Sequence, residues 1–83
     1  MLKISSKGIP VTRREVVRRI NGSLRKDDPF HVLRRSRSLR AYRELGEYYV
    51  VDRIREFVVD RGIVLETEAR RRQVLSDSEY LSD

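Results

Sequence analysis

The chain has 83 residues and a mass of 9.9 kDa, which is enough for one small domain. Apolar and charged residues each make up 39% of the sequence, so the chain is too apolar to be disordered, although its core should be thin. The absence of cysteine excludes a disulfide framework, a thiolate zinc site and a cysteine nucleophile, and one histidine is too few for a histidine-rich metal site.

No apolar run exceeds four residues, at 48–51, and the N-terminal residues lack the apolar segment of a secretory signal. We therefore expect a soluble cytoplasmic protein without a membrane span. Because a thin core gives only marginal stability, we also expect a homodimer that buries further apolar area through a hairpin or an apolar helix face.

Positive charge is concentrated in the first half of the sequence. The net charge is +6 and the isoelectric point is near 10.3. Residues 1–46 have 13 basic and 4 acidic side chains, whereas residues 47–83 have 6 and 9, so the two halves carry +9 and −3. Only three of the basic residues are lysine, and arginine is the better ligand for phosphate, although a GC-rich genome would produce the same bias.

Residues 1–10 contain glycine and proline and are predicted to form an arm or short strand that leads into a turn. Thr12 and Glu15 have the spacing of a capping box, in which the hydroxyl caps the helix and the carboxylate reaches back to the cap. A helix over 12–26 then has one apolar stripe, and the residues at 27–29, which include a proline, end it. The stripe consists of Val16, Val17, Ile20 and Leu24.

Residues 30–38 lack clean periodicity and are predicted to be a connector or an irregular extended segment. Residues 39–45 suit a short helix that ends at Gly46, a natural left-handed cap. Residues 47–62 fit a β-hairpin but also a helical stripe. We prefer the hairpin because four of the seven residues in its two apolar runs are valine. The two runs are Tyr48–Val51 and Phe57–Val59.

A final helix is predicted from residue 65 to about residue 75, supported by the favourable i,i+4 pairs Glu66–Arg70 and Glu68–Arg72. Residues 76–83 should form a short acidic tail. The sequence thus predicts a single α+β domain in the order helix, short helix, β-hairpin, helix. An all-α arrangement is the alternative if residues 47–61 are helical.

The first predicted helix supplies a candidate contact with nucleic acid. At 100° per residue, three of its arginines lie within about 40° of one another, on a ridge away from the apolar stripe. Such a ridge can follow a phosphate backbone, and Asn21 beside it could read a base edge or simply be solvated. The alternative is the ordinary solvated face of an amphipathic helix. The ridge consists of Arg14, Arg18 and Arg25.

The densest basic run spans residues 34–38 and extends into the short helix. A flexible basic segment can enter a groove or wrap RNA by charge alone. Its arginines are Arg34, Arg35, Arg37, Arg40 and Arg43. Four aromatic residues flank the run and could stack on unpaired bases, although such side chains more often belong to the core. They are Phe30, Tyr42, Tyr48 and Tyr49.

Other charged groups are expected to be structural, and Arg70–Arg72 is partly offset by the acidic residues at 66 and 68. Clustered carboxylates invite a nuclease interpretation, but solvent-facing hairpin charges explain them better, because no lysine follows at the spacing that such enzymes use. These carboxylates are Asp52, Glu56, Asp60, Glu66 and Glu68. His31 has no suitable partner in the sequence, so we expect neither catalysis nor a metal or cofactor.

The basic N-terminal half therefore favours a non-enzymatic protein that binds DNA or RNA through the eight arginines of the ridge and the run. The alternative is a protein-interaction module (an adaptor, inhibitor or assembly factor) that binds an acidic protein partner. A membrane-surface binder ranks last, because the apolar stripe of the first helix contains neither Trp nor Phe.

Overall fold

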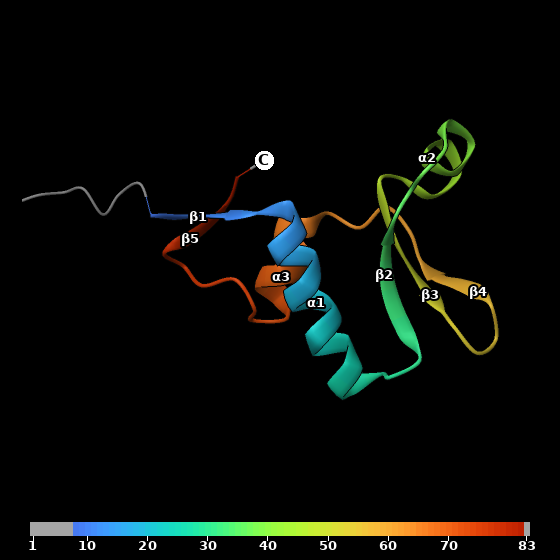
Figure 1. Cartoon of the computed structure of the whole chain (residues 1–83), viewed down its shortest axis with the longest axis horizontal. Helices are drawn as coiled ribbons and strands as arrows, with labels where there is room; N and C mark the ends of the chain where they lie inside the picture. Colours follow the sequence, from blue (N-terminus) through green and yellow to red (C-terminus); the bar gives the residue numbers. More distant parts are fainter. Residues whose placement is uncertain (1–7, 83) are drawn as a thin grey trace, which may run out of the picture.

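The first predicted helix is the centre of the fold. The computed structural model of the protein describes residues 8–82 and has α1 at Arg13–Asp27, as the stripe and cap predict (Figure 1). The Thr12 hydroxyl accepts a hydrogen bond from the Glu15 amide, at 3.1 Å. The second half of the predicted capping box is wrong, because the Glu15 carboxylate binds Arg18 and Arg19 instead of reaching back to the cap.

Three antiparallel strands follow in the order β2-β3-β4, with β2 at His31–Arg35, β3 at Tyr48–Asp52 and β4 at Phe57–Asp60. The hairpin is confirmed as β3 and β4, and the all-α alternative is wrong. The expectation of a connector at 30–38 is also wrong, because β2 pairs with β3 along its whole length. Only one of its five side chains is buried, so the local sequence has no apolar alternation that would identify a strand.

Asp52 ends β3 and organises the hairpin turn. Its carboxylate accepts hydrogen bonds from the amides of Ile54 and Arg55, both at 2.9 Å, and the residue is only 7% exposed. The backbone amide of Arg55, with that of Ile54, keeps the pKa of Asp52 below its ordinary value despite burial. The expectation that this carboxylate faces solvent is therefore wrong. His31, for which the sequence offers no partner, lies with Nε2 3.7 Å from Asp52 Oδ2.

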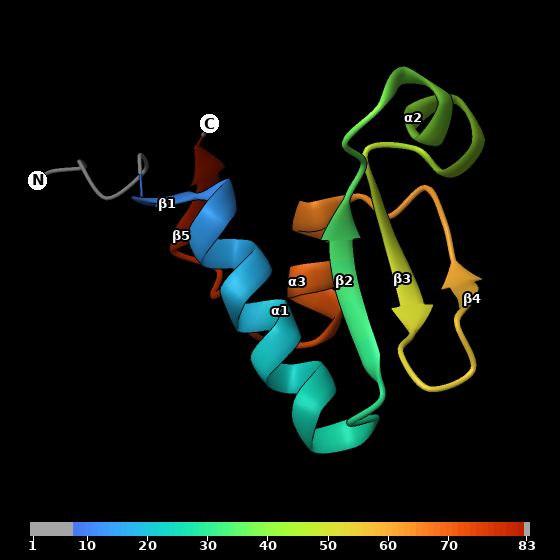
Figure 2. The same cartoon turned by 45° about the vertical axis from the view of Figure 1, so that its right-hand side comes forward.

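The predicted short helix is present as α2, Leu39–Leu45, at the end of the sheet remote from the hairpin turn (Figures 1 and 2). Ser38 caps its first turn, and Gly46 ends it with φ +81°. A side chain at Gly46 would place Cβ 3.0 Å from Cα of Gly62, so both the backbone angle and the close approach require glycine there. None of the side chains of α2 is buried.

The last helix, α3 at Leu65–Arg71, is shorter than predicted, because the chain leaves the helix at Arg72 and Gln73 has φ +61°. The expected acidic tail contains β5, Glu79–Ser82, which pairs in parallel with β1, Ile9–Thr12. The end of the expected N-terminal arm is thus a paired strand, and residues 1–7 lie outside the described residues.

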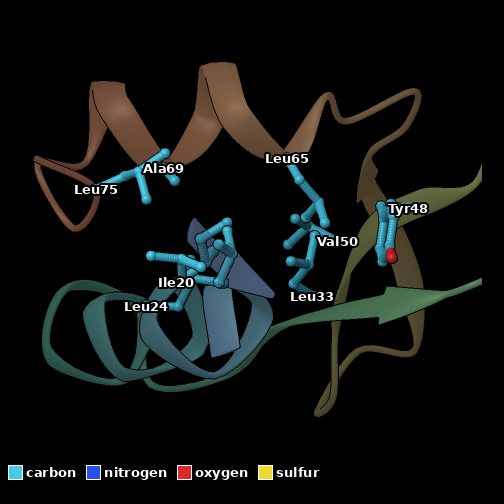
Figure 3. Close-up of a cluster of buried hydrophobic side chains, with 10 residues drawn as sticks. Ile20, Leu24, Leu33, Tyr48, Val50, Leu65, Ala69 and Leu75 are labelled. Atoms are coloured by element: carbon cyan, nitrogen blue, oxygen red, sulfur yellow. The ribbon is translucent and has the colours of Figure 1, made fainter. Parts of the chain in front are cut away.

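A cluster of buried hydrophobic side chains packs α1 and α3 against one face of the sheet (Figure 3). α1 packs against α3 and β2, and its three buried side chains lie at the centre of the cluster. α3 and the residues after it cover the cluster from the other side. The ten buried residues are Val11, Val16, Ile20, Leu24, Leu33, Tyr48, Val50, Leu65, Ala69 and Leu75.

The described residues thus form an α+β fold with three helices and five strands in two sheets. We call α1, α3, β1 and β5 the helical layer, and β2, β3, β4 and α2 the sheet layer (Figure 2). Within this part of the chain no helix combines the length and the apolar character needed to cross a membrane.

Candidate nucleic-acid interface

The predicted arginine ridge of α1 borders the free edge of β2. Asn21, on the same side of the helix as the ridge, accepts a hydrogen bond from the Leu33 amide at 2.8 Å and donates one to the Leu33 carbonyl at 3.3 Å. The Asn21 amide therefore pairs with the backbone of β2 as a neighbouring strand would. The expectation that this side chain reads a base or is solvated is wrong. Arg14 and Arg25 are exposed, whereas exposed Arg18 is paired with Glu15 at 2.6 Å.

The predicted basic run is divided among three elements. Arg34 and Arg35 end β2, Arg37 lies in the connection, and Arg40 and Arg43 are on α2. All five are exposed. Two have weak acidic partners, since Arg35 lies 3.6 Å from Glu47 and Arg40 lies 3.5 Å from Glu44. In residues 8–82, five of the eight predicted contact arginines have no acidic partner. These five are Arg14, Arg25, Arg34, Arg37 and Arg43.

The arginines of the helical layer are used differently. Arg70, Arg71 and Arg72 are each paired with Glu66 or Glu68, which confirms that the acidic neighbours offset this run. The last two carboxylates of the predicted hairpin cluster are therefore partners on α3 and not solvent-facing hairpin charges. Arg19 likewise binds the carboxylates of Glu15 and Glu79 and the carbonyl of Val74. The positive charge of these side chains is therefore offset by carboxylates of the same chain.

The sheet has one covered face and one open face. Residues directly opposite each other in antiparallel strands share a face, so the buried residues Leu33 and Val50 mark the side that packs on the helices. The alternate residues mark the other side, which is half-buried or exposed and which we call the open face. The open face consists of Val32, Arg34, Tyr49, Val51 and Val58.

A hollow of about 470 Å³ joins the open face to α2. Tyr49 and Arg34, which are register partners, form its sheet side, and Ser38 and Ala41 belong to its helix side. Arginine is its most frequent residue, and no acidic side chain lines it. We call this site the arginine hollow. Its lining residues are Leu33, Arg34, Arg35, Arg37, Ser38, Ala41 and Tyr49.

Two smaller hollows are linked to the arginine hollow through shared lining residues. Arg34 also lines a hollow of about 350 Å³ that contains Val51, Val58 and Arg53. Arg53 in turn lines a hollow of about 230 Å³ beside Arg25 of the α1 ridge. Arg34 of the run and Arg25 of the ridge, which are separate in the sequence, therefore line two hollows that share Arg53 as a lining residue.

A larger hollow, of about 650 Å³, lies between α1 and α3, but we consider it a weaker anion site. Two of its four cationic side chains, Arg19 and Arg72, are paired with carboxylates. Only Arg25 and Lys26 remain without an acidic partner among the described residues. A bound phosphate would compete there with carboxylates that are already in place.

The four aromatic residues near the basic run have different environments. Tyr48 is buried in the core, as aromatic side chains usually are. Phe30 and Tyr42 are more than half exposed, so a core position for them is wrong. Tyr49 is half-buried at the arginine hollow. Of the four, Tyr49 is therefore the aromatic residue that lines the same hollow as the unpaired Arg34 and Arg37.

In residues 8–82, no three His, Asp or Glu side chains are grouped closely enough to hold a metal ion. Comparison of the chain with models of protein families, with curated proteins and with solved structures found no match. The chemistry of the arginine-rich surface is therefore the basis for a function.

Proposed function

We propose that this protein binds nucleic acid through the arginine hollow and the α1 ridge, without catalysing a reaction. The single observation that carries the proposal is the contrast in arginine pairing. Arg19, Arg70, Arg71 and Arg72 bind carboxylates of the same chain, whereas Arg34 and Arg37 at the hollow and Arg14 and Arg25 on the α1 ridge have no acidic partner in residues 8–82. Unpaired guanidinium groups beside a half-buried aromatic ring suit phosphate and base contacts.

The position of the unpaired arginines further supports a phosphate ligand. Arg34 and Arg37 line the arginine hollow, Arg34 also lines a hollow over the open face, and Arg25 lines a hollow beside His31 and Val32 of β2. A polyanion can contact several of them at once and release its counterions, whereas a small anion gains from one or two. We therefore expect modest affinity and little sequence preference, because no side chain in this set is fixed for base readout.

A salt titration tests the proposal. Binding of labelled duplex and single-stranded oligonucleotides is measured by fluorescence anisotropy between about 50 and about 200 mM salt. If four to six phosphates are contacted, the log–log slope for duplex DNA should be about 0.9 per contact. The hollow triple (Arg34→Gln, Arg35→Gln and Arg37→Gln) should lower the slope by up to about three units.

A matched control removes three positive charges elsewhere. The control triple (Arg55→Gln, Arg61→Gln and Arg71→Gln) changes exposed side chains that line none of the basic hollows. It should reduce the slope much less, with circular dichroism confirming that both triples are folded. Equal losses from the two triples would mean diffuse charge attraction, and no binding by the folded wild type at low salt would refute the proposal.

The exposed apolar side chains of α2 favour a second candidate, an acidic protein partner. Leu39 and Tyr42 are 65% and 56% exposed, which is unusual for large apolar residues on a helix beside a basic surface. A protein partner would cover these side chains, so its binding should survive high salt and weaken in Leu39→Ser. Binding lost at high salt supports the nucleic-acid proposal instead.

A further inference from the structure

The alternation of β3 fixes Tyr49 as the aromatic residue of the open face. Tyr48 and Val50 on either side of it point into the core, so the Tyr49 side chain must project to the opposite side of the sheet. The residue is half-buried, and Arg34 lies directly across from it on β2. Its ring is therefore supported by the sheet yet remains accessible from the arginine hollow.

The hollow has the size and the charge for one nucleotide. Its volume of about 470 Å³ lies within the range of about 300–1,000 Å³ that is typical of small-molecule sites. Arg34, Arg35 and Arg37 line it together with Tyr49, and Arg35 also lies 3.6 Å from Glu47. Arginine supplies donors for phosphate oxygens, and the tyrosine ring supplies a stacking surface for a base.

The Tyr49 side chain is half-buried at the arginine hollow, and this position should allow an unpaired base, but not a base in a duplex, to stack on its ring. A base in an intact duplex is stacked above and below, so its flat face cannot meet a half-buried side chain that lines a hollow. An unpaired base can leave its stack and lie on an aromatic ring while arginines hold the adjoining phosphates. The neighbouring positions Val51 and Val58 add apolar surface on the same face.

We infer that the ligand of the arginine hollow is single-stranded nucleic acid, with one unpaired base stacked on Tyr49 and its flanking phosphates bound by Arg34 and Arg37. This inference rests on the proposed function and makes it more specific, because the same arginines could also bind a duplex through its phosphates alone. Stacking on Tyr49 is the feature that a duplex cannot reproduce.

The experiment compares two strands of equal length and charge, one with bases and one composed of abasic sites, at a single low salt concentration. Wild-type protein should bind the base-bearing strand about ten-fold more tightly, because stacking of one base adds to the phosphate contacts. Tyr49→Leu should remove this preference, and Tyr49→Phe should retain it. Tyr80→Leu, which changes an exposed tyrosine on β5, is the matched control and should leave the preference unchanged.

The comparison of the two strands requires no variant, so it decides the question even if Tyr49→Leu fails to fold. Equal affinity of wild-type protein for the two strands would overturn the stacking inference while leaving the phosphate contacts of the proposed function intact. A duplex that binds as tightly as the base-bearing strand, with or without Tyr49, would overturn it in the same way. Absence of binding to every oligonucleotide would refute the proposed function itself.

Discussion

The helical layer and the sheet layer differ in how many of their arginines are paired with carboxylates. In the helical layer, most arginines bind groups of the same chain, as Arg19 does with the Glu79 carboxylate and the Val74 carbonyl, and the exposed ridge residues Arg14 and Arg25 are the exceptions. In the sheet layer, the arginines at the end of β2 and after it point to solvent around the arginine hollow. The positive charge of the sequence therefore separates into a part that stabilises the fold and a part that is available to a ligand.

The two layers also differ in how deeply their side chains are buried. The three side chains that are fully buried and largest, Ile20, Leu24 and Val16, all come from α1. α2 has no buried side chain, and neither has β4. Substitutions in the helical layer should consequently change stability, and substitutions on the open face or at the hollow should change binding.

The largest difference should come from the core. Ile20→Ala should lower the free energy of unfolding by about 2–5 kcal/mol, because it leaves a cavity among fully buried neighbours. Val58→Ala on the open face should cost only about 1 kcal/mol. Urea denaturation measures both, and Ile20→Val, at about 0.5–1.5 kcal/mol, replaces the alanine variant if that variant is unfolded. Equal losses at the two positions would mean that a second copy covers the open face in solution, as a homodimer would.

A smaller difference should separate paired from unpaired arginines. Arg72 is held by a 2.8 Å hydrogen bond to Glu68, with side chains that are only 15% and 14% exposed. Arg72→Gln should therefore cost about 1–2 kcal/mol of unfolding free energy, whereas Arg34→Gln should stay within about 0.5 kcal/mol. The two variants change the net charge equally, so a comparable loss in thermal denaturation would contradict the division between structural and available arginines.

The contact between the two layers is tested at Asn21. Asn21→Ala removes both hydrogen bonds to Leu33 and leaves the edge of β2 without its partner. We expect a loss of about 1 kcal/mol and faster hydrogen exchange of the Leu33 amide, while amides of α3 keep their protection. An unchanged exchange rate at Leu33 would show that this side chain does not protect the edge strand.

The smallest effect concerns acid stability and belongs to the helical layer. Hydrogen bonds from Arg18 and Arg19 lower the pKa of Glu15 from 4.5 to about 2. Between these two pH values the unfolded chain binds more protons than the folded protein, so the free energy of unfolding should fall as the pH falls through this range. Arg19 also lowers the pKa of Glu79, which adds to the same slope.

Glu15→Gln should flatten this dependence, because the amide does not titrate. Urea denaturation at a series of pH values from neutral to about 2 measures the slope for the wild type and the variant. Identical slopes would mean that the two arginines do not hold the Glu15 carboxylate in solution.

Local sequence patterns correctly predicted those helices and strands that are determined by residues close together in the sequence. The cap at Thr12 and the stripe through Ile20 define α1, and Gly46 ends α2. The valine-rich runs define the hairpin. In each case the decisive residues belong to one element or to its ends, so their spacing in the sequence was sufficient to predict the element.

The errors concern residues that are defined by distant partners. β2 has one buried residue and exists because β3 and Asn21 bind its two edges. β1 and β5 are only four residues long, and neither has a sequence pattern that identifies the other as its partner. Asp52 is buried by the turn that it caps. The sequence shows the eight arginines as a concentration of positive charge, but their division into paired and unpaired groups, and the position of Tyr49 at the arginine hollow, depend on tertiary packing.

The parallel pairing of β1 with β5 has a consequence for the order of folding. Its register joins Ile9 to Glu79, so the first described strand has to wait for a segment synthesised seventy positions later. Such distant pairing forms slowly unless other contacts bring its strands together, and here the packing of α1 on α3 does so. On the ribosome, α1 and the antiparallel sheet can form while β1 is still unpaired. Closure of β1 on β5 then marks the moment at which the chain becomes fully native.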